Sequence, residues 1–203
     1  MGIMDAAFWN SRYTAPHYVY GEEPNGFLAT MASYIPAGPV LCFAEGEGRN
    51  AVHLATLGHQ VTAVDQAESG LAKARRLAAL RGVEIETVVA DLSDFEVKPA
   101  AWAGIVAIFA HLPPAIRRRV HAQSVRGLRP GGMFVLEAYT PAQLAFETGG
   151  PKSPELLMDL ASLREELAGL DFLISREIER NIIEGDYHTG RSAVVQILAS
   201  RHE

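Results

Sequence analysis

A short apolar strand that opens into a glycine-spaced turn is the feature that most constrains the fold of this chain. Residues 40–44 are mostly apolar, Gly46 and Gly48 follow two positions apart, and residues 50–57 have the pattern of a helix. A second β-rich run, residues 60–64, is followed by Asp65. In parallel sheets such a turn approaches a nucleotide-like cofactor, and the acid after the second strand receives ribose hydroxyls. The pattern therefore predicts a cofactor site at Gly46, Gly48 and Asp65.

The rest of the chain alternates short β-rich runs with helical segments. Helices are predicted at 50–57, 69–81 and 113–128, and glycine-containing turns end each of them. This alternation is typical of parallel strands joined by crossover helices, so we expect an α/β fold with a doubly wound sheet. The predicted strands are residues 40–44, 60–65, 85–90, 105–109 and 132–138.

Both ends of the chain depart from this alternation. Residues 153–165 predict two short helices or one broken helix, with a possible capping box at Ser162 and Glu165. Residues 171–183 and 192–200 are β-rich, and the turn-rich link 184–191 predicts an antiparallel hairpin at one edge of the sheet. Residues 1–39 are rich in aromatic residues and predict a helix and loop that cover the core, residues 40–203, of a single domain.

Composition excludes several classes of partner. At 203 residues and 48% hydrophobic content, the chain is long enough to bury one core without metals or disulfides. The net charge of −6 argues against a surface built to bind nucleic acid. No apolar stretch approaches the ~18 residues of a membrane span, and the N-terminus lacks a signal-peptide pattern. We expect a cytoplasmic monomer or homodimer. Because Cys42 is the only cysteine, disulfides and cysteine-based metal sites within one chain are excluded. We expect no metal site of another kind.

Two cofactor classes suit the glycine turn. A nicotinamide dinucleotide fits the spacing of Gly46, Gly48 and Ala51. S-adenosylmethionine fits as well, and it places its adenine near an acid after the third strand. Asp91 and Leu92 stand at that place, and dehydrogenases do not require such an acid. No Tyr-x-x-x-Lys pair or similar hydride-transfer group is visible, so the pattern favours S-adenosylmethionine.

With these motifs the chain resembles the class I S-adenosylmethionine-dependent methyltransferases, and within them most the tellurite-resistance and thiopurine methyltransferase-like branch. The resemblance runs from Phe8 to Ser200 and implies a Rossmann-like seven-stranded sheet in the order 3-2-1-4-5-7-6, with the seventh strand antiparallel and helices on both faces. The chain departs from the family at Cys42 and Ala44, where an aspartate and a glycine are usual. The motifs that carry the resemblance are residues 8–13, 20–25, 46–51, Asp65, Asp91, Leu92 and 128–132.

The resemblance implies methyl transfer from S-adenosylmethionine to a small-molecule acceptor, with release of S-adenosylhomocysteine. It implies that Glu45 faces the ammonium group of the cofactor, Asp65 its ribose, and Asp91 with Leu92 its adenine. The full set of expected cofactor-binding residues is Tyr13, Tyr20, Glu45, Gly46, Gly48, Asn50, Asp65, Gln66, Asp91, Leu92 and Phe109.

Catalytic and acceptor-binding residues are expected at the carboxyl ends of the fourth and fifth strands. His111 follows the fourth strand and is the candidate base, with ordering of the next turn as the alternative. Tyr139 follows the fifth strand, and His188 and Arg191 lie in the hairpin link; these three are candidates for binding the acceptor or for stabilising turns. Two other functions stay open: a sensor that binds S-adenosylmethionine without transferring its methyl group, and a nicotinamide-dependent reductase.

Overall fold

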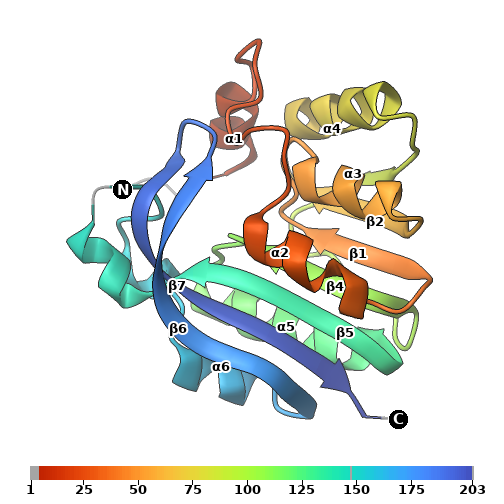
Figure 1. The fold of residues 1–203 in the computed structure, drawn as a ribbon, viewed down its shortest axis with the longest axis vertical. Coiled ribbons are helices and arrows are strands. Elements are labelled where there is room, and N and C mark those ends of the chain that lie inside the picture. The colour runs from red at the N-terminus through yellow and green to blue at the C-terminus, as the bar shows by residue number, and fades with distance from the viewer. Residues whose placement is uncertain (1–4, 147, 203) are drawn as a thin grey trace.

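The computed structural model describes residues 5–146 and 148–202, and seven strands of these residues form one sheet in the order β3-β2-β1-β4-β5-β7-β6 (Figure 1). Strands β1 to β5 pair in parallel, and β7 is antiparallel to both of its neighbours. The seven-stranded order implied by the resemblance is confirmed. The strands are β1 (Pro39–Phe43), β2 (Gln60–Asp65), β3 (Glu86–Val89), β4 (Trp102–Ile108), β5 (Leu128–Tyr139), β6 (Leu170–Glu184) and β7 (His188–Arg201).

Helices cover both faces of this sheet, because its central strands are apolar on both sides. Leu41 and Phe43 pack in the core that includes α5 and α6, whereas Val40 and Cys42 pack in the core that includes α2 and α3. The predicted helices and the broken helix near 153–165 are confirmed. The helices are α1 (Ala6–Arg12), α2 (Gly26–Met31), α3 (Arg49–Thr56), α4 (Glu68–Leu80), α5 (Pro114–Gly127) and α6 (Leu160–Glu166), with the 3-10 turns η1 (Ala32–Tyr34), η2 (Pro141–Ala145) and η3 (Pro154–Leu156).

Three local predictions are wrong. The hairpin link is shorter than 184–191, since Glu184 pairs with His188 and Gly185, at φ 69°, permits a tight turn. Strand β5 begins at Leu128, which pairs with Trp102, rather than at Gly132. The side chain of Asp159, not that of Ser162, caps α6 by accepting the Ser162 amide.

The aromatic N-terminal segment lies between the hairpin tip and α4 (Figure 1). Asn10 of α1 accepts the Ser69 amide through its side chain at 2.9 Å and the Ser69 hydroxyl through its carbonyl at 3.0 Å, which fixes α1 to the start of α4. On the other side, the Asp186 amide donates to the carbonyl of Val19 at 2.8 Å. The segment is thus held from both sides, next to the carboxyl ends of the central strands.

Candidate functional site

The glycine turn after β1 is built on left-handed backbone angles. Ala44, Gly46 and Gly48 have φ values of 48°, 59° and 90°. A Cβ atom on Gly48 would lie 2.4 Å from the Cβ of Ala74, so glycine permits α3 and α4 to approach each other here. A Cβ atom on Gly46 would lie 2.5 Å from Oη of Tyr13, which shows how closely Tyr13 covers the turn.

Asp65 connects the end of β2 to this turn. Its Oδ2 accepts the Gly46 amide and its Oδ1 accepts the Ala67 amide, each at 2.8 Å. Burial raises the pKa of Asp65, and the amides of Ala67, Gly46 and Gln66 oppose that rise. Each carboxylate oxygen has a second lone pair. Because three backbone amides are directed at its four lone-pair sites, Asp65 is oriented by the backbone and retains capacity to accept one further hydroxyl group.

Glu45 caps α3 from inside the turn. Its Oε1 accepts the amides of Asn50 at 3.0 Å and Ala51 at 2.7 Å. The amides of Asn50 and Ala51 in the first turn of α3 are thus already used by the protein. Burial raises the pKa of Glu45 from 4.5 to about 7, against the opposing effects of these amides and Arg49. Its predicted contact with a ligand ammonium stays a prediction.

The other expected cofactor residues surround the same turn. The Tyr13 ring is buried over Gly46 and Gly70, and Tyr20 accepts a hydrogen bond from Arg12 at 2.9 Å. The side chain of Asn50 accepts the Asn25 amide at 2.9 Å, so Asn50 also positions the N-terminus of α2.

The segment after β3 reaches this place because the Ala90 amide donates to the carbonyl of Asp65 at 3.0 Å. Asp91 is exposed and accepts the Ser93 amide at 2.7 Å, while Leu92 is buried in the core.

A stack of aromatic rings follows β4. Phe109 adopts φ 53°, a strained angle for a residue with a side chain, and its amide donates to the backbone carbonyl of Glu137 at 2.7 Å. Its ring stacks on Tyr139 with centroids 4.7 Å apart, and His111 lies 5.6 Å from Tyr139 in a nearly parallel plane. His188 meets the edge of Phe109 at 4.4 Å. The structure therefore brings four of the predicted residues together.

Both ring nitrogens of His111 contact the backbone. Nδ1 lies 2.8 Å from the carbonyl of Leu156 and must donate to it, and Nε2 accepts the Tyr139 amide at 3.3 Å. Burial lowers the pKa of His111 to about 4. These contacts favour a positioning role, and the catalytic base at this residue stays a prediction.

Arg191 lies apart from the ring stack. Its side chain is 73% exposed and its Nε pairs with Glu179 at 2.8 Å. Its contact with an acceptor stays a prediction.

A buried charge network, which the sequence did not predict, lies beside the rings. The Nη2 of Arg49 contacts Glu184 at 2.7 Å, and Arg180 binds Glu137 with both Nε and Nη2, at 2.8 and 2.7 Å. The Asn25 side chain donates to both carboxylates. One signal was available in the sequence: Glu137 is a charged residue within an apolar strand, and a buried charge requires a partner.

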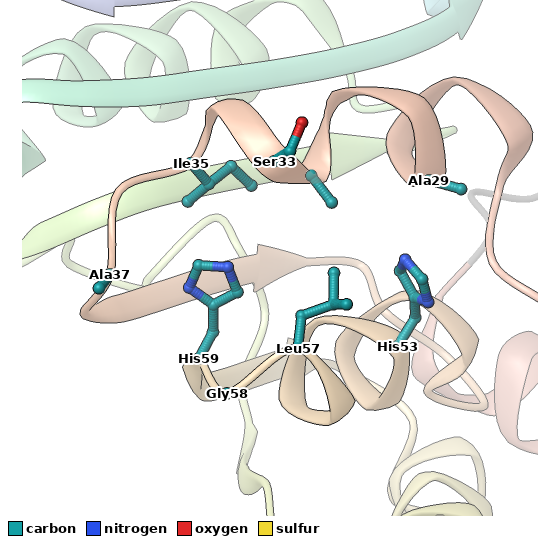
Figure 2. A pocket seen from close by; sticks show the side chains of 9 residues that line it. Ala29, Ser33, Ile35, Ala37, His53, Leu57, Gly58 and His59 are labelled. Carbon is teal, nitrogen blue, oxygen red and sulfur yellow. The ribbon is translucent and has the colours of Figure 1, made fainter.

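A separate groove of about 430 Å³ lies near the amino ends of the central strands, away from the glycine turn at their carboxyl ends (Figure 2). It runs between α2 with η1 and the end of α3, close to the starts of β1 and β2, and is therefore distinct from the glycine turn. Its lining residues are Ala29, Ala32, Ser33, Ile35, Ala37, His53, Leu57, Gly58 and His59.

Two classes of site are not found among residues 5–146 and 148–202. No group of three or more His, Cys, Asp or Glu residues in these ranges has the geometry to hold a metal ion. In the same part of the chain, no helix combines the length and the apolar character that crossing a membrane requires.

Residues 40–132 match a family described as a methyltransferase domain. A 2-heptyl-1-hydroxyquinolin-4(1H)-one methyltransferase from Mycobacteroides abscessus is 30% identical over 147 residues, which are 70% of this chain. The match spans 65% of that relative's length.

Solved structures share the fold. TehB from Haemophilus influenzae has a TM-score of 0.70 at 19% identity, with 97% of this chain and 66% of that chain covered. The N-methyltransferase NodS from Bradyrhizobium japonicum WM9 has a TM-score of 0.67 at 14% identity, with 99% and 100% covered. Together with the strand order and the glycine turn, the matches identify residues 40–132 as a methyltransferase domain. The chain has the fold of the class I S-adenosylmethionine-dependent methyltransferases.

Proposed function

We propose that this chain binds S-adenosylmethionine at the Gly46–Gly48 turn and transfers its methyl group to a small-molecule acceptor, with release of S-adenosylhomocysteine. One observation carries the proposal. The Gly46 amide, in a turn whose glycines have no side chains, donates to the carboxylate of Asp65 and so fixes that carboxylate beside the turn. Asp91 stands exposed after the next strand, which supports its proposed contact with the adenine. These residues fit the cofactor that the family uses.

When bound, S-adenosylmethionine supplies a methyl group already activated on a sulfonium, so the protein has mainly to align the reactants and exclude water. Asp65 orients the ribose, and Tyr13 and Tyr20 cover the turn on the solvent side. The aromatic stack of Phe109 and Tyr139 forms the wall on the acceptor side.

The relative from Mycobacteroides abscessus is named for a small hydroxyquinolinone, which supports a small-molecule acceptor for this chain. The net charge of −6 supports the further proposal that no nucleic acid is involved. We also propose a cytoplasmic location and a monomeric or homodimeric state.

Calorimetry with S-adenosylmethionine, S-adenosylhomocysteine and NADH tests the cofactor. Asp91→Ala removes an exposed carboxylate and should weaken binding of S-adenosylmethionine roughly 3- to 10-fold, the value of one hydrogen bond. Asp65→Ala should weaken it more, provided that its circular dichroism spectrum is native. Asp94→Ala, also exposed, is the matched control. Binding of NADH alone would establish the reductase instead.

Turnover separates an enzyme from a sensor. The departure from the family at Cys42 and Ala44 is the observation that favours a sensor. Formation of S-adenosylhomocysteine with any member of a panel of phenols, thiols, amines and chalcogen oxyanions supports the transferase. Saturable cofactor binding with no turnover across that panel supports the sensor.

A further inference from the structure

Three buried polar atoms beside the aromatic stack have no hydrogen-bond partner within the described part of the chain. They are Nη1 of Arg49, Oη of Tyr139 and Nδ1 of His188. Arg49 is 7% exposed and Tyr139 is fully buried. Because an unpaired buried polar group costs free energy, these three atoms mark a place where a ligand can supply partners.

The three residues are connected through Glu184 and His188 and border the same region of the molecule. Glu184, which pairs with Nη2 of Arg49 at 2.7 Å, is directly opposite His188 in the β6–β7 hairpin. The rings of His188 and Tyr139 have centroids 5.5 Å apart. Arg49 is the first residue of α3, immediately after Gly48, so this region adjoins the cofactor turn.

The ring of Tyr139 is covered by its neighbours, so its hydroxyl is the part of this side chain that a ligand can contact. Phe109 stacks on its ring, and a Cβ atom on Gly150 would lie 2.7 Å from the ring's Cδ2. Burial and then Glu184 raise the pKa of Tyr139, and the nearby hydroxyl of Ser192 lowers it. Ser192 Oγ donates to the carbonyl of Gly190 at 3.2 Å, and Oη of Tyr139 has no partner at hydrogen-bond geometry. Tyr139 is therefore a hydrogen-bond donor.

At His188, the neighbouring charged groups that affect the imidazole are positive. Burial lowers the pKa of His188 most, and Arg49, His111, Arg12 and Arg180 lower it further, which indicates a positive potential at the imidazole. The carboxylates of Glu184 and Glu137 are already paired with Arg49 and Arg180.

Aromatic rings border this region. Phe109 is partly exposed, and with its strained φ of 53° its ring lies in an edge contact with His188, with centroids 4.4 Å apart. Tyr20 from the N-terminal segment lies 4.7 Å from His188. Flat rings packed at such distances favour a planar aromatic ligand.

We propose that the methyl acceptor is a planar aromatic molecule with an acidic hydroxyl group, whose ionised oxygen is bound by Nη1 of Arg49 and Oη of Tyr139. This inference rests on the proposed function. The hydroxyl loses its proton to water on ionising. An oxygen lone pair forms the new bond to the methyl carbon, and the broken carbon–sulfur bond leaves its electron pair on sulfur. The products are a methyl ether and a thioether, and no oxidant is required.

The test uses 7-hydroxycoumarin, a planar acidic phenol whose anion is fluorescent, added to the full chain saturated with S-adenosylhomocysteine. We expect it to bind as the anion, with its apparent pKa lowered by about one unit. The control ligand, 7-methoxycoumarin, has no ionisable oxygen and should bind at least ~10-fold more weakly, because a charge-assisted hydrogen bond is lost.

Variants assign the binding atoms. Tyr139→Phe should weaken binding of 7-hydroxycoumarin about 10-fold, and Arg49→Gln about 10- to 100-fold. Neither should change the affinity for S-adenosylhomocysteine more than about 2-fold. Tyr34→Phe and Arg118→Gln, at exposed side chains, are the matched controls. Tyr139→Phe keeps the test decisive if Arg49→Gln does not fold.

Several outcomes would overturn the inference. Equal binding of the two coumarins would show that an ionised oxygen is not recognised. Weaker binding of S-adenosylhomocysteine to Arg49→Gln, with unchanged coumarin binding, would assign the unpaired nitrogen to the cofactor carboxylate. Binding of S-adenosylhomocysteine without coumarin binding would refute this inference alone, whereas failure of both S-adenosylmethionine and S-adenosylhomocysteine to bind would refute the proposed function.

Discussion

At the scale of single residues, backbone angles shape the turn that receives the cofactor in our proposal. Ala44 and Gly48 both have positive φ, but they meet different surroundings. Ala44 keeps a side chain in a left-handed conformation, where its family usually has glycine. Gly48 has no side chain because α4 leaves no room for one.

Replacement of Ala44 by glycine should change the free energy of unfolding by less than about 1 kcal/mol. The relief of left-handed strain, on the order of 1 kcal/mol, offsets the greater entropy of glycine in the unfolded chain. Ala63→Gly, in the middle of β2, has no strain to relieve and should be clearly destabilising. Urea unfolding measures both variants, and equal losses would show that Ala44 is not strained.

Gly48→Ala should destabilise the protein by about 2 kcal/mol or more, because the new Cβ would lie 2.4 Å from the Cβ and 2.6 Å from the Cα of Ala74. Gly58→Ala is a matched control: φ is 92° at Gly58 and 90° at Gly48, but nothing lies within 4 Å of a Cβ on Gly58. Thermal unfolding of the two variants separates the clash from the backbone strain. Similar losses of stability in the two variants would show that the close packing of Gly48 against Ala74 does not contribute.

At the scale of elements, the start of α3 depends on an internal carboxylate. Glu45 accepts the amides of Asn50 and Ala51, a role that a capping side chain usually performs. The cap is buried, however, so its ionised form is costly. The two amides lower the pKa of Glu45 and burial raises it. The charge of Glu45, and with it the stability of the fold, therefore depends on pH.

The stability difference between Glu45→Gln and the natural chain should therefore depend on pH. Burial raises the pKa of Glu45 from 4.5 to about 7. Between these values the folded chain binds a proton that the unfolded chain has lost, so the stability of the natural chain decreases as pH rises through this window. The change approaches about 3 kcal/mol at ~1.4 kcal/mol per pH unit. Glutamine keeps an acceptor oxygen and does not titrate.

Urea unfolding at pH 5, 6, 7 and 8 measures this difference. We expect Glu45→Gln to gain on the natural chain steadily from pH 5 to pH 7 and to level off above it. Glu23→Gln, at a side chain that is 82% exposed, controls for the loss of one negative charge. A stability difference that is the same at all four pH values would contradict the raised pKa.

The elements were predictable to the extent that their signals are local. Apolar runs and terminal glycines predicted β1, β2 and α3 closely, because the signals for a strand and for the end of a helix depend only on a few neighbouring residues. The hairpin register was not predictable, since Glu184 and His188 are polar and resemble a loop until they pair.

The network of Arg49 with Glu184 was beyond sequence reasoning for a different reason. These partners are 135 residues apart, and only the closed sheet brings them together. For the same reason the sequence placed Tyr139 and His188 in separate loops, whereas the structure puts their rings 5.5 Å apart.

At the scale of the whole molecule, the N-terminal segment connects the glycine turn to the hairpin. Glu47, in the middle of the turn, accepts the Tyr20 amide at 3.2 Å and the Lys73 ammonium at 2.7 Å. Arg12 lies 4.2 Å above the ring of Tyr187 at the hairpin tip. Each part of the site is thus held by a segment distant in sequence, and we expect this cover to open when ligands enter.

The contact between Gly185 and the N-terminal segment should control that opening. A Cβ on Gly185 would lie 2.4 Å from the carbonyl oxygen of Val19, so Gly185→Ala should push the segment from the hairpin. Gly82→Ala is the matched control, because both glycines have φ 69° but nothing lies within 4 Å of a Cβ on Gly82.

Hydrogen exchange should report faster exchange of residues 6–21 in Gly185→Ala than in Gly82→Ala, with similar exchange in β1 and β4. Dissociation of S-adenosylhomocysteine should also be faster in Gly185→Ala, because the cover that must open for release is already loosened. If both variants exchange alike in residues 6–21, the hairpin does not hold the N-terminal segment. Faster exchange with unchanged dissociation would show instead that the segment opens but does not limit release.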